Sequence, residues 1–199
     1  ESRDLIMENR VISEFIQKTC SNSPTPGGGS VAALLASLAA SLAAMSANLT
    51  IDKKGYEEYQ NQMIYLAKLF ENKADIYLKY MNQDIQAFND VMASYKLKKD
   101  TLEEKEYRSK VIQEKLYNAM QVPLSLALDI YAILDDVRWC YYNSNKNIQS
   151  DALMAMIMAR GTILSCVCNV GMNLKSMKDN IDKEPILNEE LTNLANDIS

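Results

Sequence analysis

Apolar positions recur along most of this chain at the three- and four-residue steps of amphipathic helices. The longest stripe runs from Tyr56 to Tyr95 and predicts one helix of about 60 Å at 1.5 Å per residue. Helices of that length are typical of bundles and coiled coils. One position of the stripe, between Met81 and Phe88, is occupied by a carboxylate, Asp84.

The segment from Val31 to Leu49 contains no charged residue and is rich in Ala and Ser. It is nearly long enough to span a membrane, so a membrane-anchored protein is one interpretation. The Ala content instead favours close packing against other helices, and no positive flank or aromatic belt precedes the segment. We therefore predict a central, fully surrounded helix and no membrane association.

The remaining segments also show helical spacing, and none shows the alternation of a strand. Thr101 and Glu104 form a capping box that opens a helix, and Pro123 suits the first turn of a following one. The predicted helices are 5–20, 31–49, 56–95, one from 101, 124–142, 152 to about 177, and a short one from Pro185. Residues 1–199 are thus predicted to form a single all-α domain, a bundle of long antiparallel helices.

The composition narrows the class of protein. Hydrophobic residues make up 48% of the chain and charged residues 24%, as in a globular domain. The net charge of −5 and the lack of a dense Lys/Arg patch argue against nucleic-acid binding. Four cysteines without a secretory signal or a disulfide pattern indicate a reducing, cytoplasmic location.

The chain contains no histidine. This excludes Ser-His-Asp and Cys-His catalysis and His-based zinc sites. Proton transfer must then use a carboxylate, Lys, Tyr or Cys with a shifted pKa. We expect no metal site, although a Mg²⁺ site made only of carboxylates stays open.

The segment Pro24-Thr-Pro-Gly-Gly-Gly-Ser30 is the strongest local motif. Gly27, Gly28 and Gly29 leave backbone N–H groups accessible, and the N-terminus of the following helix favours an anion or a carbonyl oxygen. Ser30 is a plausible N-cap. The motif is not a Walker loop, because no Lys-Ser/Thr follows the glycines. The alternative interpretation is a flexible connector between two helices.

Asp84 is the leading candidate for acid–base chemistry. Within an apolar stripe its carboxyl should be partly desolvated, with a raised pKa or a specific partner. The alternative is an ion pair with a Lys across a helix interface. Tyr77 and Tyr95 are flat enough to stack on a planar ligand, but core packing is the simpler prediction for both.

A polar turn supplies a second group of candidates, Asn145, Asn147 and Asp151. Two amides and a carboxylate at a helix start suit recognition of a heterocycle, although the same residue types are common in turns and N-caps. Arg160 is the lone charge within the apolar helix predicted from Ala152. It either pairs with a buried carboxylate or extends to solvent.

Taken together, these segments resemble the cyclodeaminase/methenyltetrahydrofolate cyclohydrolase family. The resemblance covers nearly the whole chain and rests on Ser23 to Ala33, Asp84 to Ala93, Asn145 to Ala152, and the run from Ala159 to Leu174. It implies a helical homodimer with folate bound near the glycine segment, at or close to the subunit interface. It also implies no cofactor beyond the tetrahydrofolate substrate, which is possibly polyglutamylated.

The reaction implied by the resemblance is conversion of 5-formiminotetrahydrofolate to 5,10-methenyltetrahydrofolate with release of ammonia. The alternatives are hydrolysis of the methenyl compound to 10-formyltetrahydrofolate, or a non-catalytic folate-binding dimer. Asp84 is then the acid–base residue, and Gly27 to Ser30 hold the pterin or the reacting unit. Asn145, Asn147 and Asp151 would contact the pterin edge, and Lys96 and Arg160 would meet carboxylates.

Overall fold

The computed structural model of this protein describes residues 12–177, which contain helices and turns but no strand. The all-α prediction is confirmed for this part of the chain. The first predicted helix is seen as α1, Ile12–Thr19, and its earlier residues lie outside the described range. The helix predicted from Pro185 lies outside it as well.

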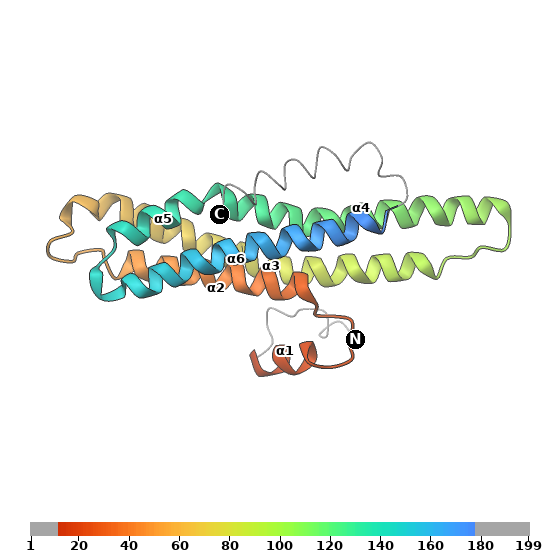
Figure 1. Cartoon of the computed structure of the whole chain (residues 1–199), viewed down its shortest axis with the longest axis horizontal. Coiled ribbons are helices and arrows are strands. Elements are labelled where there is room, and N and C mark those ends of the chain that lie inside the picture. The colour runs from red at the N-terminus through yellow and green to blue at the C-terminus, as the bar shows by residue number, and fades with distance from the viewer. Residues whose placement is uncertain (1–11, 178–199) are drawn as a thin grey trace.

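Four long helices lie side by side and form a bundle (Figure 1). They are α2 (Gly28–Asn48), α3 (Gln60–Tyr95), α4 (Leu102–Ala132) and α6 (Gln149–Lys175). α2 packs on α3 and α6, and α4 packs on the same two helices from the other side. The short elements η3 (Glu57–Tyr59), α5 (Leu134–Asn143) and η4 (Lys146–Ile148) belong to one end of the bundle.

The Ala-rich helix α2 buries a complete face within the bundle. Its buried positions include Ala33, Ala36, Ala40 and Ala47, which meet larger side chains of α3 such as Phe70. Small residues on one helix and large ones on the other allow close approach without voids.

The prediction that α2 is fully surrounded is wrong for the single chain. Val31, Leu38, Met45 and Leu49 are 39%, 46%, 37% and 50% exposed. The reason is that α2 has only two long helices as close neighbours, so one apolar face stays uncovered.

The stripe from Tyr56 to Tyr95 forms α3, except that a short 3₁₀ turn precedes the helix at Gln60. Its buried positions follow the predicted spacing, as at Met63, Tyr77 and Met81. An ion pair of 2.6 Å between Lys73 Nζ and Asp129 Oδ1 links α3 to α4.

The start of α4 is as predicted, but its end is not. Thr101 and Glu104 form the capping box, with both reciprocal hydrogen bonds present. Pro123 does not open a new helix and lies inside α4, which continues to Ala132. Proline removes one backbone donor from a helix, and the loss is tolerable where another group satisfies the freed carbonyl.

Two helices are long and apolar enough to span a membrane by length and composition, Gly28–Asn48 and Lys146–Lys175. The bundle buries 61% of the most apolar stretch of the first helix and 33% of that of the second. Core helices of bundles have the same length and composition, so these features do not by themselves indicate a membrane protein.

Candidate active site at the N-terminus of α2

The glycine segment is the first turn of α2 rather than a loop in front of it. The helix begins at Gly28, with Gly27 as its N-cap, and no side chain caps it. The prediction that Ser30 is the N-cap is therefore wrong by three positions. The Ser30 hydroxyl has another partner, and the first turn needs no side-chain cap because a carboxylate from α3 supplies the acceptor.

That carboxylate is Asp84, half-buried on α3. Ser30 Oγ donates to Asp84 Oδ2 over 2.7 Å, and the Ser30 backbone N–H also donates to this side chain. A negative charge is favoured at this place, because the unpaired N–H groups of a helix N-terminus carry partial positive charge. The glycine segment and Asp84, which the sequence analysis treats as separate candidates, are therefore in contact.

Gly29 makes this approach possible. A Cβ added to Gly29 would overlap Asp84 Oδ1 and lie 2.6 Å from its Cγ. At Gly28 an added Cβ would lie 3.4 Å from Asn169 Oδ1, and at Gly27 it would lie 3.5 Å from the Pro24 carbonyl oxygen, both ordinary contacts. Of the three glycines, only Gly29 is required by the geometry.

The surroundings shift the pKa of Asp84 upward. Burial raises the pKa of this carboxyl, and the two hydrogen bonds from Ser30 oppose the shift without cancelling it. Cys166, fully buried on α6, has its pKa raised to about 12 by burial and by the charge of Asp84. The thiol therefore stays protonated, which leaves the Asp84 carboxyl as the proton-exchanging group of this site.

A cavity of about 240 Å³ adjoins Asp84. It is enclosed by α3, α4 and α6, and its lining includes Phe88, Tyr95, Ala119 and Asn173. The α3–α4 hairpin extends beyond the N-terminus of α2 (Figure 1). The helix α2 therefore does not cover the other helices at the level of this cavity. Tyr95 is 43% exposed at this cavity, so the prediction that it packs in the core is wrong, whereas Tyr77 is in the core as predicted.

Two amides on α6 belong to this site and were not among the predicted site residues. Asn169 lies against Gly28, and Asn173, one turn later on the same face, lines the Asp84 cavity. A signal for them was present in the sequence, since both interrupt an otherwise apolar helix. Spacing along one helix did not show that this face meets the glycine segment.

The polar turn with Asn145, Asn147 and Asp151 lies at the opposite end of α2. The Asn145 backbone N–H donates to Thr50 Oγ1 over 2.9 Å, and its side-chain amide donates to the Leu49 carbonyl over 3.3 Å. About 20 residues of helix, roughly 30 Å, separate these bonds from Ser30. Within one chain these three residues do not share a site with Asp84.

The two predicted cations differ in position. Lys96 is exposed and follows Tyr95 directly, at the C-terminal end of α3, so it lies near the rim of the Asp84 cavity. Arg160 is half-buried on α6, nine residues or about 13 Å of helix before Asn169. In the part of the chain that the structure describes, no ion pair of Arg160 is found.

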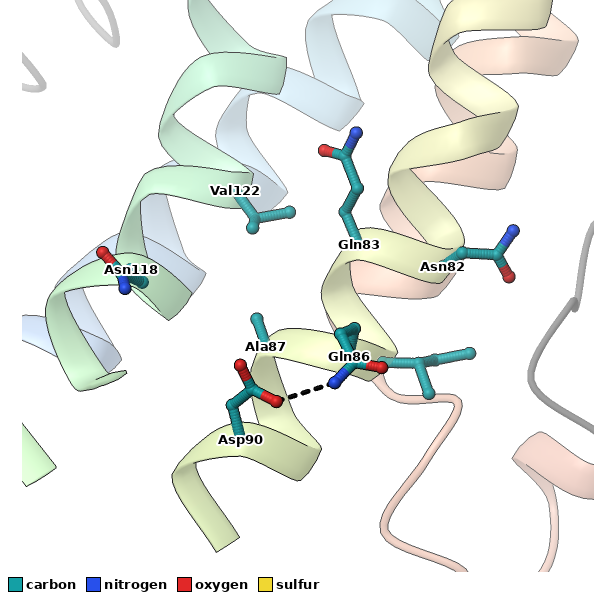
Figure 2. Close-up of a pocket in the computed structure, with 8 residues that line it drawn as sticks. Asn82, Gln83, Gln86, Ala87, Asp90, Asn118 and Val122 are labelled. Carbon is teal, nitrogen blue, oxygen red and sulfur yellow. Dashed lines mark hydrogen bonds between the residues drawn. The ribbon is translucent and has the colours of Figure 1, made fainter. Parts of the chain in front are cut away.

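A larger groove of about 550 Å³ lies between α3 and α4 and does not include Asp84 (Figure 2). Its lining carries amides such as Gln83 and Asn118, together with Asp90, which accepts a 2.7 Å hydrogen bond from Gln86. Gln86 follows Asp84 by two residues and therefore lies on another face of α3. We take the smaller cavity as the candidate active site, because it joins a desolvated carboxylate to a helix N-terminus.

No group of three or more His, Cys, Asp or Glu side chains is placed to hold a metal ion among residues 12–177. Asp84, Ser30 and the α6 amides are instead donors and acceptors of hydrogen bonds. The arrangement suits proton transfer to a bound organic molecule.

Comparison with known proteins identifies similar chains. The family model described as formiminotransferase-cyclodeaminase matches residues 11–191. The methenyltetrahydrofolate cyclohydrolase of Methylorubrum extorquens is 34% identical over 181 residues, covering 91% of this chain and 87% of that protein. The formimidoyltransferase-cyclodeaminase of Mus musculus is 31% identical over 170 residues, which is 85% of this chain but 31% of that longer protein.

The fold has a counterpart among solved structures. The crystal structure of formiminotetrahydrofolate cyclodeaminase from Thermotoga maritima superposes with a TM-score of 0.79 and 26% sequence identity. The match covers 96% of this chain and 89% of that one. The whole bundle is therefore shared.

Proposed function

This chain belongs to the formiminotransferase-cyclodeaminase family of folate one-carbon enzymes, and we propose that it converts 5-formiminotetrahydrofolate to 5,10-methenyltetrahydrofolate with release of ammonia. The observation that carries the proposal is the Asp84 carboxylate held in a small cavity by Ser30. Methenyltetrahydrofolate cyclohydrolase is the second candidate, because a relative with that name matches along 87% of its own length. We place either activity in the cytoplasm, in keeping with the free cysteines of the described range.

In the deaminase reaction, N10 of the protonated formimino substrate attacks the formimino carbon and forms the C–N10 bond. Asp84 takes the proton from N10 and returns it to the exocyclic nitrogen of the tetrahedral adduct. The C–N bond to that nitrogen breaks, ammonia leaves, and the N5 lone pair forms the methenyl cation. A carboxylate with a raised pKa suits both the removal and the return of the proton.

In the cyclohydrolase reaction, a water molecule attacks the methenyl carbon while Asp84 removes a proton from that water. Asp84 returns its proton to N5 as the bond from the carbon to N5 breaks, the hydroxyl group of the adduct loses its proton to solvent and becomes the formyl carbonyl, and the formyl group stays on N10. Both reactions need one proton-transfer group placed beside the carbon between N5 and N10. The same site geometry therefore serves either, and the chemistry must be assigned by assay.

Two assays on one purified sample decide between them. Ammonia release from 5-formiminotetrahydrofolate reports the deaminase, and loss of methenyl absorbance in the absence of other enzymes reports the hydrolase. Turnover in the first assay supports our proposal, and turnover in the second alone supports the alternative. Tetrahydrofolate binding without turnover in either would establish a non-catalytic binding protein.

The family resemblance implies a homodimer, and the exposed face of α2 supports one. The helix α2 packs on α6, which also exposes apolar side chains. On α6 these are Met154, Ile157, Leu164 and Met172, at 54%, 60%, 45% and 64% exposed. An apolar surface spread over two neighbouring helices is typical of a subunit interface. We propose that two copies pair through this surface, which we call the α2–α6 face.

An antiparallel two-fold pairing would place the N-terminus of α2 in one copy near the C-terminus of α2 in the other. The polar turn with Asn145, Asn147 and Asp151 would then approach Asp84 of the partner. This would bring to one folate the residues that a single chain keeps about 30 Å apart.

Charge placed in the α2–α6 face is expected to separate the copies. Leu38→Glu and Ile157→Glu should each convert a dimer to a monomer, because either change buries an unpaired carboxylate in the interface. Tyr107→Glu, at a 63% exposed site on α4, is the matched control and should leave the dimer intact. Light scattering after size exclusion measures the result, and a wild-type monomer contradicts the proposed pairing.

Co-expression tests the shared site directly. Dimers of Asp84→Asn with Asn147→Ala contain one site with both native residues, so about a quarter of all sites in a random mixture are complete. Activity recovered to that level from two inactive parents supports a site built by both copies. Full activity of Asn147→Ala alone contradicts it.

A further inference from the structure

The Asn173 side chain connects α6 to a break in the hydrogen bonding of α4. Its amide nitrogen Nδ2 donates to the Ala119 carbonyl oxygen over 3.4 Å. Both residues line the cavity that contains Asp84. The contact therefore lies at the wall of the proposed active site.

Pro123 explains why Ala119 accepts this bond. In an α-helix the carbonyl of residue 119 receives the N–H of residue 123, and proline has none. Pro123 is buried within α4, far from either end of the helix. The Ala119 carbonyl is thus left without its helical donor, and Asn173 provides a replacement.

This contact fixes the orientation of the Asn173 amide. A carbonyl oxygen can only accept a hydrogen bond, so the edge of the amide that faces Ala119 must be the NH₂ group. The amide is planar, and its oxygen Oδ1 must therefore point away from Ala119. Oδ1 takes no part in the bond to Ala119. An oriented acceptor is available on the residue that lines the cavity.

The size of the cavity indicates which part of a folate this acceptor meets. A volume of about 240 Å³ is below the usual range for a whole drug-sized ligand and suits one ring system. The aromatic side chains Phe88 and Tyr95 also line the cavity. A reduced pterin ring presents several N–H donors, whereas the benzoyl-glutamate part presents few.

We propose that Asn173 is a specificity residue whose Oδ1 accepts an N–H of the reduced pterin ring, oriented by the Ala119 carbonyl that Pro123 leaves free. The inference rests on the proposed folate activity and deepens it. Asp84 performs the proton transfer, and Asn173 sets which edge of the ring faces it. Loss of the acceptor leaves a ring N–H unpaired in a confined site and weakens substrate binding.

The test combines Asn173→Ala with Pro123→Ala. Asn173→Ala should lower the melting temperature and raise KM by roughly tenfold, since one hydrogen bond is lost in the complex. Pro123→Ala restores the N–H that pairs with Ala119, so the double variant should regain the melting temperature. If Asn173 binds the substrate, the KM of the double variant stays above that of the wild type. If KM recovers together with stability, Asn173 is only structural and the proposal is wrong.

Two further measurements keep the outcomes separate. Asn118→Ala removes an amide from the other groove of α3 and α4 (Figure 2), and its KM should equal that of the wild type. Binding of tetrahydrofolate itself is titrated in parallel with turnover. If the wild type binds tetrahydrofolate but turns over neither folate, and Asn173→Ala weakens that binding, the assignment of Asn173 is supported. Only the enzymatic proposal is then contradicted. Wild-type affinity in Asn173→Ala contradicts the assignment.

Discussion

Asp84→Asn is expected to lower kcat by about 10²- to 10⁴-fold, the usual contribution of a positioned acid–base group. The asparagine has nearly the same shape, and its oxygen can still accept the hydrogen bond from Ser30. The variant should therefore fold normally and lose only the group that carries the proton. Steady-state kinetics with both candidate folates measure the loss.

The same variant has a predictable effect on stability. Burial raises the pKa of Asp84 above its value in the unfolded chain, so wild-type stability falls as pH increases through the pKa of the folded state. Asp84→Asn lacks this ionisation. Its melting temperature should equal or exceed that of the wild type near neutral pH, with the difference shrinking in acid.

The pH dependence of turnover has the opposite sign. Asp84 starts the reaction as a base in its ionised form, so wild-type kcat should decrease as the pH falls through its raised pKa. Asp90→Asn, on another face of α3, is the control and should keep wild-type kinetics. Wild-type turnover in folded Asp84→Asn would remove Asp84 from the mechanism.

Gly29→Ala is expected to lower kcat by about 100-fold, through displacement of the Asp84 carboxylate. The added methyl group would occupy the position of Oδ1, and the short Asp84 side chain cannot move away without breaking its bond to Ser30. A shift of about 1 Å in a reacting group is sufficient for a loss of this size. Alanine favours the helix by about 1 kcal/mol over glycine, so helix propensity cannot explain a loss.

Gly28→Ala is the matched control for this prediction. Like Gly29→Ala, it replaces glycine by a better helix former in the first turn of α2. Its methyl group, however, makes only an ordinary contact with Asn169. Gly28→Ala should keep its activity, and a loss as large as that of Gly29→Ala would contradict the steric argument. Asp84→Ala removes the overlapping atoms, so Gly29→Ala should destabilise the wild type more than it destabilises Asp84→Ala.

Much of the bundle could be predicted from local pattern. The stripe on α3 and the Thr101–Glu104 capping box each depend on residues within a few positions of one another. Pro123 was misinterpreted for the same reason, because its tolerance inside α4 depends on Asn173, 50 residues later. A local rule for proline cannot include a donor supplied by another helix.

The candidate site was predictable only in part. Asp84 and the glycine segment were identified because each breaks the pattern of its own surroundings, a charge in an apolar stripe and three glycines before a helix. Asn169 and Asn173 break the pattern of α6 in the same way, yet their partners lie on α2 and α4. The Asn145 turn was also a candidate, although its residue types are common in turns, and it lies at the far end of the bundle.

The sequence by itself determined that this protein is helical, where its longest helix runs, and that any acid–base chemistry must do without histidine. These properties follow from residue spacing and residue type, which need no knowledge of distant contacts. Only the tertiary structure decided that Gly29, rather than all three glycines, is required, and that Asp84 occupies the start of α2. Such contacts join positions more than 50 residues apart in the chain, and helix packing alone brings them within hydrogen-bond distance.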